Sequence, residues 1–337
     1  MDGVHQIGPE SSKHDFGALR IAVILPCYNE EHAIGQVVAD FREALPTAEI
    51  YVYDNNSTDR TVDVAHEAGA IVRTEPRQGK GNVVRRMFSD VDADIFVLAD
   101  GDDTYEAGAA PELIRKLLDH QLDMVTGRRV AIDAEKAYRR GHRFGNRALT
   151  GLVQLFFGVG TQDMLSGYRV MSRRFVKSFP ALSLGFEIET ELTVHALELR
   201  MPIADHPTAY KERPPGSVSK LSTIKDGMRI GFTIIRMLKA ERPLMFFSSI
   251  ASALALLSLV LIAPVFWEYL QTGLVPRFPT AILSGFLMLA AIVSVAAGLI
   301  LDSVTLGRRE LKRLSYLNLP ATSRHRSQLG ARVGETV

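Results

Sequence analysis

Residues 21–31 read IAVILPCYNEE, an apolar run that gives way abruptly to polar side chains. The apolar part, Ile21–Leu25, is short and uncharged, as expected of a buried strand. Similar runs recur at 50–53, 70–72, 95–99 and 124–126, and helical patterns lie between the runs at 30–44, 58–68, 81–89 and 109–118. Alternation of this kind predicts an α/β domain with a mostly parallel sheet and helices on both faces.

Polar clusters follow three of these predicted strands, at 26–31, 54–59 and 100–103. Asn, Asp and Ser are turn formers and helix caps, which would be a sufficient explanation for any one cluster. In open sheets, however, ligands bind beyond the carboxyl ends of the strands. Three clusters at corresponding strand ends therefore favour a binding site.

The third cluster, Asp100-Gly101-Asp102-Asp103, places three carboxylates within four residues at the end of a buried strand. That arrangement is electrostatically unfavourable without a cation. Hard divalent ions such as Mg²⁺ take oxygen ligands and often share them with phosphates. The cluster predicts a site for Mg²⁺ or Mn²⁺ on a diphosphate, and the basic, glycine-rich turn 77–81 predicts an anion site nearby.

Taken in order, these clusters resemble the motifs of the inverting GT-A glycosyltransferases of family 2. Residues 26–30 are similar to the family's P-x-Y-N-E start, 54–59 to its D-[DN]-x-S-x-D segment and 100–102 to its D-x-D motif. The resemblance implies a GT-A fold and a nucleotide-sugar donor, with the metal on Asp100 and Asp102. The donor-binding residues that it implies are Pro26, Tyr28, Glu30, Asp54, Asn56, Lys80, Asp100, Gly101, Asp102, Arg213 and Lys220.

Segments in the second half of the domain resemble one particular group within this family. Segments 127–129, 143–146 and 163–169 are similar to those of polyprenyl-phosphate hexosyltransferases, the group of dolichol-phosphate mannose synthases and GtrB-like glucosyltransferases. The acceptor-binding residues implied are Arg129, Arg143, Asn146, Ser166 and Arg169, and the catalytic residues implied are Asp163, Arg129 and Arg143. Arg128 and Thr104 depart from the group, which usually has Ser and Gln there.

The residues themselves leave other readings open for this half. Arg143 could belong to a solvated helix face, and Asp163 could merely orient Arg169. Glutamates at 187, 189 and 191 are candidates for positioning the sugar, although two of them could simply be exposed.

Two segments, 244–267 and 278–301, contain no charged residue. At 24 residues each they would be roughly 36 Å long as helices, more than the roughly 30 Å of a bilayer's hydrocarbon layer. A pair of buried core helices is the alternative, but core helices of this length normally carry a polar face. Lysine and arginine crowd both outer flanks while Arg277 alone occupies the connection, so the positive-inside rule predicts a cell-membrane (cytoplasmic, inner-membrane) protein with both termini and the catalytic domain in the cytoplasm.

These patterns divide the chain into five parts. They are a flexible tail at 1–20, a catalytic domain at 21–215, a juxtamembrane amphipathic helix at 216–242, a transmembrane hairpin at 243–302 and a cytoplasmic tail at 303–337. Within 223–240 the basic and apolar residues fall on opposite helical faces, which suits the headgroup layer of a membrane. An ordinary surface helix is the alternative for that segment.

A net charge of +1 over 337 residues gives no global basic field, so nucleic acid is not an expected partner. The predicted function is hexose transfer from a UDP- or GDP-sugar to undecaprenyl or dolichyl phosphate at the bilayer surface, by an enzyme that two-span relatives suggest self-associates. A processive polysaccharide synthase is one rival, but the Gln-x-x-Arg-Trp motif is absent because the only tryptophan is Trp267. A non-catalytic nucleotide-sugar-binding scaffold is the other, and the intact Asp100/Asp102 pair argues against it.

Overall fold

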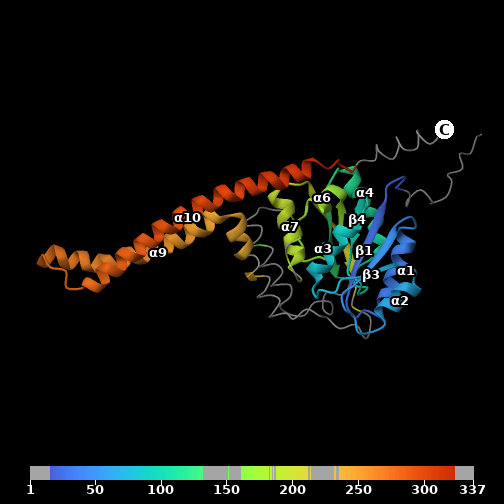
Figure 1. The fold of residues 1–337 in the computed structure, drawn as a ribbon, viewed down its shortest axis with the longest axis horizontal. Helices are drawn as coiled ribbons and strands as arrows, with labels where there is room; N and C mark the ends of the chain where they lie inside the picture. Colours follow the sequence, from blue (N-terminus) through green and yellow to red (C-terminus); the bar gives the residue numbers. More distant parts are fainter. Residues whose placement is uncertain are drawn as a thin grey trace, which may run out of the picture. The chain divides into compact units, whose positions relative to one another are not determined.

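The computed structural model describes residues 16–131, 151, 161–181, 183, 185, 187–211, 213, 231–232 and 235–322. The chain divides into two compact units, Met1–Gly231 with Leu314–Val337, and Phe232–Arg313. The first is an α/β unit and the second a helical hairpin (Figure 1).

A seven-stranded sheet in the order β3-β2-β1-β4-β6-β5-β7 forms the centre of the α/β unit. The strands are β1 (Ile21–Cys27), β2 (Glu49–Asp54), β3 (Ile71–Thr74), β4 (Ile95–Leu98), β5 (Met124–Ala131), β6 (Arg169–Ser172) and β7 (Ile203–Tyr210). All neighbouring pairs are parallel except those of β6, which runs antiparallel to β4 and β5. The predicted mostly parallel α/β sheet is confirmed.

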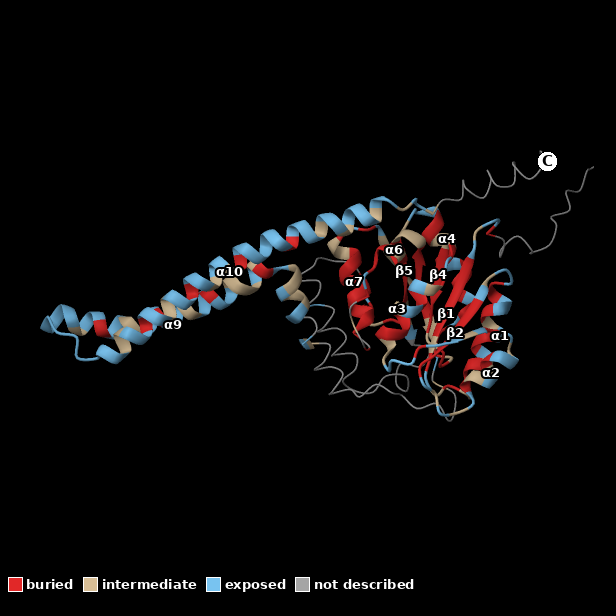
Figure 2. Cartoon of the chain, viewed as in Figure 1, coloured by how far each residue is buried: buried red, intermediate tan, exposed pale blue. Residues whose placement is uncertain are grey.

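Helices cover both faces of this sheet, and β1 shows why its sequence is apolar throughout. Val23 and Leu25 pack with the helices on one face, while Ala22 and Ile24 pack with those on the other. The helices on the first face are α1 (Ile34–Ala44), α2 (Thr61–Glu67) and α4 (Ala110–Asp119), and those on the second are α3 (Lys80–Asp90), α6 (Arg173–Ser178) and α7 (Ile188–Glu198). Side chains alternate across a strand, so a strand buried on both sides must be apolar at every position. Figure 2 shows the resulting buried layer along the strands.

The turns after β1, β2 and β4 each contain one residue in the left-handed backbone region: Asn29 (φ 53°), Asn56 (φ 66°) and Asp103 (φ 55°). Asn and Asp tolerate that conformation better than other side chains apart from glycine. The polar clusters predicted from sequence are therefore turn-forming sequences as well as site-forming ones, and both readings apply to the same residues.

The second unit contains α9 (Pro243–Thr272) and α10 (Phe278–Leu317). The mean hydropathy of their most apolar windows is 2.4 and 2.3, and only 17% of each window is buried. Both helices are thus long and apolar enough to cross a membrane, and their surfaces are too exposed for buried core helices (Figure 2).

Small side chains line the contact between these two helices. The buried positions recur every seven residues, at Ala251, Ser258 and Val265 on α9 and at Ser284, Ala291, Gly298 and Thr305 on α10. Ser258 Oγ donates a hydrogen bond of 2.8 Å to the carbonyl oxygen of Ser284. A Cβ on Gly298 would lie 3.1 Å from the Cβ of Phe247, so glycine allows the helices to approach closely here.

At the start of the hairpin, basic residues of α10 surround the carboxylate of Glu241. Arg308 lies 2.9 Å from it and Lys312 lies 3.5 Å from it. Thr305 Oγ1 and Arg308 also donate to the carbonyl oxygen of Ala240, at 3.1 and 2.6 Å. Residues 235–241 are helical, whereas most of the predicted amphipathic segment lies outside the described residues.

Candidate active site

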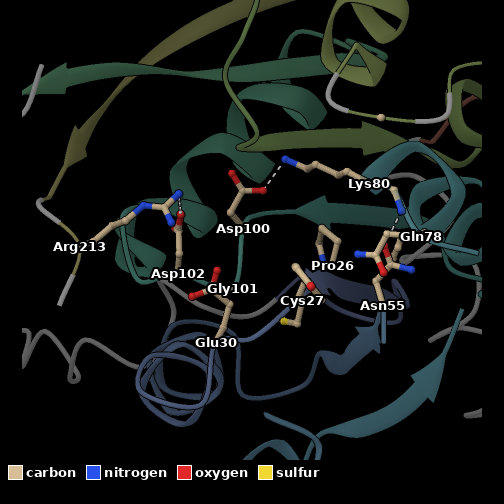
Figure 3. A pocket seen from close by; sticks show the side chains of 14 residues that line it. Pro26, Cys27, Glu30, Asn55, Gln78, Lys80, Asp100, Gly101, Asp102 and Arg213 are labelled. Atoms are coloured by element: carbon tan, nitrogen blue, oxygen red, sulfur yellow. Dashed lines mark hydrogen bonds and ion pairs between the residues drawn. The ribbon is translucent and has the colours of Figure 1, made fainter. Parts of the chain in front are cut away.

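A cavity of about 280 Å³ opens at the carboxyl ends of β1 and β4, the edge at which ligands were expected. Its lining residues are Pro26, Cys27, Tyr28, Glu30, Asn55, Gln78, Gly79, Lys80, Val83, Asp100, Gly101, Asp102, Gly185 and Arg213. Most of the predicted donor-binding residues are among them (Figure 3). The structure therefore brings together residues from six separate parts of the chain.

The two central carboxylates are each paired with a cation. Lys80 Nζ lies 2.5 Å from Asp100 Oδ1, and Arg213 Nη2 lies 2.5 Å from Asp102 Oδ2. Figure 3 shows Lys80 reaching toward Asp100 and Arg213 toward Asp102 across the cavity. Lys80 Nζ also lies 2.6 Å from Glu189 Oε1, on the first turn of α7.

Burial governs the electrostatics of this cluster. Burial and the neighbouring charge of Asp100 raise the pKa of Asp102 above its ordinary value, against the opposing influence of Arg213. Burial alone would lower the pKa of Lys80, but the carboxylates of Asp100 and Glu189 raise it overall. Lys80 is therefore a permanent cation at neutral pH.

Glycine at position 101 is required by the tight packing beneath the two aspartates. A Cβ on Gly101 would lie 2.4 Å from Cys27 Sγ, far inside any normal contact. A Cβ on Gly167 would likewise lie 2.7 Å from Asp100 Oδ2. The backbone at Gly101 lies against Cys27, and the backbone at Gly167 lies against Asp100. These close contacts fix the backbone positions from which the Asp100 and Asp102 side chains extend.

Thr104, the residue that departs from the resembled group, supports Asp102. Its hydroxyl donates to Asp102 Oδ1 at 2.6 Å, and both residues are buried. A shorter side chain than the usual Gln therefore still makes a direct contact with the carboxylate.

Asn55 is the lining residue that the sequence reasoning missed most clearly. Its side-chain nitrogen donates to the carbonyl oxygens of Glu75 and Arg77, both at 2.8 Å, and its Oδ1 accepts from the Gly79 N–H at 2.7 Å. These bonds hold the loop that leads into α3. The first turn of α3 consequently faces the cavity, where its N–H groups suit an anion.

Asp54 and Asn56, which were predicted to bind the donor, do not line the cavity. Asp54 is buried and accepts from the backbone N–H groups of Asn56 and Ser57, at 3.1 and 3.2 Å. Asn56 donates through its side chain to Pro76 O and to Gln78 Oε1. In the structure both residues build the turn, and their contact with a donor stays a prediction.

Arg129 and Asp163 form a second ionic group. Arg129 Nε and Nη2 donate to the two carboxylate oxygens of Asp163 at 2.8 and 2.7 Å, a bidentate pair. The Arg129 backbone N–H also donates to Asp163 at 3.1 Å, and the guanidinium lies 5.5 Å from the Tyr210 ring centroid. Asp163 thus orients Arg129, rather than Arg169 as the alternative reading had it.

Ser166 and Arg169, which the resemblance implies as acceptor-binding residues, expose no side-chain surface in the structure. Both side chains are fully buried, and Ser166 Oγ donates to the Gly127 carbonyl oxygen at 2.6 Å. The five N–H groups of Arg169 have five protein acceptors: the carbonyl oxygens of Ser166, Met164 and Glu189, Thr193 Oγ1 and Met124 Sδ. Burial lowers the pKa of Arg169 to about 10, so the guanidinium remains charged at neutral pH. Arg143, Asn146 and Lys220 lie outside the described residues.

Comparison with known proteins gives consistent similarities. The family model described as glycosyl transferase family 2 matches residues 22–179. Glycosyltransferase AglJ of Haloferax volcanii is 32% identical over 299 residues, covering 88% of this chain and 98% of that protein. A dolichyl-phosphate hexose transferase of the same organism is 30% identical over 222 residues, covering 66% of this chain and 95% of that protein.

Among solved structures, glucosyl-3-phosphoglycerate synthase from Mycobacterium tuberculosis, in complex with Mn²⁺, UDP and its product, has a similar fold. The TM-score is 0.54 at 22% identity, over 69% of this chain and 85% of that chain. At that identity the likeness concerns the fold.

Proposed function

The chain belongs to glycosyl transferase family 2, and on that premise we propose that it transfers a hexose from a nucleotide-sugar to a polyprenyl phosphate at the cytoplasmic face of a membrane. The observation that carries the proposal is one cavity in which Asp100 and Asp102 face Lys80 and Arg213. Carboxylates for a cation and basic groups for a diphosphate are the two halves of a nucleotide-sugar site.

The cavity supports the donor half of the reaction. Lys80 begins α3, so its ammonium group and the N–H groups of that helix terminus can both stabilise a diphosphate. Arg213 lines the opposite part of the same cavity and offers a planar donor group suited to phosphate oxygens. Gly79 has a φ of 128°, which lets the backbone come close to the ligand without a side chain between them.

The residues fit a divalent cation, Mg²⁺ or Mn²⁺, held by Asp100 and Asp102. Carboxylate oxygens are the ligands that such hard cations prefer. Among the described residues, no group of three or more His, Cys, Asp or Glu side chains forms a complete metal site. The donor diphosphate and water would supply the remaining oxygens, as the Mn²⁺–UDP complex of the structural neighbour suggests. When bound, the cation would neutralise charge on the leaving nucleoside diphosphate.

The Arg129–Asp163 pair supports the acceptor half. A phosphate monoester is already largely anionic at pH 7, so it needs an orienting cation more than a strong base. We assign Arg129 to the acceptor phosphate, with Arg143 and Asn146 as its predicted companions, and Asp163 to holding the Arg129 guanidinium in place. One phosphate oxygen then forms the new bond to the anomeric carbon while the bond to the nucleoside diphosphate breaks on the opposite face, with inversion.

Helices α9 and α10 support a lipid acceptor. A long isoprenoid remains in the bilayer, so an enzyme that uses it must work at headgroup depth. The similarity to a dolichyl-phosphate hexose transferase points to the same class of acceptor. Self-association of the chain stays a prediction.

The test is a panel of UDP- and GDP-sugars with undecaprenyl or dolichyl phosphate and Mg²⁺ or Mn²⁺, using the full chain in membranes. We expect one donor to give a single organic-extractable product whose mass adds one hexose to the lipid phosphate. A polymeric product would instead identify a processive synthase, and binding without turnover would identify a scaffold. Activity that survives complete chelation of divalent ions would contradict the assigned role of Asp100 and Asp102.

A further inference from the structure

Both carboxylates assigned to the cation are already occupied by side chains of the protein. Lys80 holds Asp100, and Arg213 holds Asp102, each at 2.5 Å. A divalent ion must therefore bind two carboxylates that each already carry an internal cation, on Oδ1 of Asp100 and on Oδ2 of Asp102. Positive charges held on one carboxylate repel one another, so the ammonium or guanidinium group and the metal ion oppose each other's binding.

The formal charges of the residues around the cavity favour the binding of one further cation. Among the described residues that line the cavity or pair with its lining, the formal charges of four carboxylates (Glu30, Asp100, Asp102 and Glu189) and two cations (Lys80 and Arg213) sum to two negative charges. One divalent ion would neutralise them. Adding the ion while both cations stayed in place would, however, bring three positive groups onto the same two aspartates.

Glu189 provides Lys80 with a second carboxylate partner besides Asp100. Its Oε1 lies 2.6 Å from Lys80 Nζ, and its side chain is 7% exposed. Among the described residues, Glu189 Oε2 is a buried atom with no hydrogen-bond partner, so it can accept a further bond if the lysine shifts. Lys80 thus keeps Glu189 as a charged partner when Asp100 is taken by another cation.

We propose that Lys80 and Arg213 are place-holding cations, which occupy the metal-binding aspartates in the empty enzyme and transfer to the donor diphosphate when the metal ion binds. This inference rests on the proposed function. It makes the two ligands mutually reinforcing: the metal releases the basic groups that the diphosphate needs, and the diphosphate draws away the groups that block the metal. Such coupling is reciprocal by thermodynamic linkage.

The experiment measures Mn²⁺ binding directly, from the electron paramagnetic resonance signal of free Mn²⁺, with and without UDP, at pH 8. The variants are Lys80→Met and Arg213→Met. Lys211→Met is the matched control, because Lys211 lies 3.7 Å from Asp103 and is bound to neither Asp100 nor Asp102 in the described contacts. Thermal unfolding of each variant establishes that it is folded.

Without UDP, we expect Lys80→Met to bind Mn²⁺ about tenfold more tightly than wild type, which corresponds to about 1.4 kcal/mol. The factor by which UDP improves Mn²⁺ binding should fall by a similar amount, because no cation has to be displaced. UDP itself should bind the variant more weakly in the presence of Mn²⁺. Arg213→Met should show the same signs, and Lys211→Met should change Mn²⁺ affinity by less than about twofold, since its charge lies on a screened, partly exposed carboxylate.

Two results would overturn the inference alone. One is unchanged or weaker Mn²⁺ binding by both Lys80→Met and Arg213→Met while wild type still shows UDP-dependent Mn²⁺ binding. The other is equal tightening by Lys211→Met, which would show a general effect of charge. If wild type binds neither Mn²⁺ nor UDP, the proposed function fails, and this inference fails with it.

Discussion

Asp102 is a buried carboxylate of the cavity with two side-chain partners, Thr104 and Arg213. Asp102→Asn keeps the shape of the side chain and removes its charge, so we expect the rate of hexose transfer to fall at least about a hundredfold, as when a preorganised electrostatic group is lost. The measurement is initial rate at saturating metal.

Asp103 offers the matched control for that change. It adjoins Asp102 but does not line the cavity, and its left-handed backbone (φ 55°) accommodates Asn readily. Asp103→Asn should retain at least about half of the activity. Equal losses in the two variants would mean that the charge of the whole turn matters and Asp102 has no special role.

Gly101→Ala tests the packing beneath the aspartates. The new methyl group would lie 2.4 Å from Cys27 Sγ, so we expect the free energy of unfolding to fall by about 1–3 kcal/mol, the usual cost of overpacking. Adding Cys27→Ala removes the sulfur and should restore part of that loss. Chemical denaturation of the two single variants and the double variant gives the coupling energy, and additive effects would contradict the direct clash.

The residues of the cavity show which parts of the site could be predicted from local sequence. Asp100, Gly101 and Asp102 could be predicted because their spacing after a strand carries chemical meaning. Asp54 and Asn56 were predicted as ligand contacts, and Asn55 between them was missed, because the direction of each side chain depends on the left-handed turn at Asn56. Ser166 and Arg169 were predicted to bind the acceptor from the resemblance of segment 163–169, and a motif does not show which of its polar side chains are buried.

At the scale of secondary structure, Arg169 joins elements that are far apart in sequence. Its guanidinium lies at the start of β6 and binds carbonyl oxygens of the 163–167 turn and of α7. Arg169→Met would leave three buried carbonyl oxygens without these donors. We expect a loss of about 3–5 kcal/mol in the free energy of unfolding, typical of breaking a buried charged network.

Arg173→Met is the comparison for that measurement by chemical denaturation. Arg173 pairs with Asp92 at 2.7 Å, but both side chains are substantially exposed. Surface pairs contribute about 0–1 kcal/mol, so this variant should unfold nearly as wild type does. A small effect of Arg169→Met would show that the buried network has little importance for stability.

Strand β6, which begins with Arg169, also shows why part of the sheet could not be predicted from the sequence. The apolar runs that became β1 to β4 were predicted because each is followed by turn residues and a helical pattern, and the run that became β5 because it follows the last of these helical patterns. β6 and β7 were not predicted: β6 is four residues long and begins with Arg169, and β7 includes Asp205, His206 and Pro207. Charged or proline-containing strands lack the apolar signal, and β6 and β7 form only through pairing with β4 and β5, which are distant in sequence.

The contact between α9 and α10 can be tested with one substitution at two positions. Ser258→Leu would place a large side chain where Ser258 meets the Ser284 backbone, so we expect the two helices to be forced apart and the hairpin to lose stability. Ser252→Leu, on an exposed position of the same helix, should be tolerated. Thermal unfolding in detergent compares the two variants, and equal midpoints would argue against close packing at Ser258.

At the scale of the whole molecule, the length of α10 bears on how the chain meets a membrane. Its 40 residues correspond to roughly 60 Å, about twice the hydrocarbon thickness. The apolar part ends at Leu301, and Asp302 is the first of several charged residues that follow. With the proposed membrane topology, the second half of α10 would emerge from the bilayer as a continuous helix, on the side where the positive-inside rule predicts cytoplasm.

This orientation can be measured with single cysteines, because Cys27 is the only natural one and is buried. Val275→Cys lies in the connection between α9 and α10, and Asn318→Cys lies just after α10, both at exposed positions. A membrane-impermeant maleimide added to intact cells should label Val275→Cys and leave Asn318→Cys unlabelled until the membrane is permeabilised. Wild type supplies the blank. Labelling of Asn318→Cys in intact cells would place the catalytic unit outside the cytoplasm, where nucleotide-sugars are not made, and would contradict a donor of that class together with the orientation.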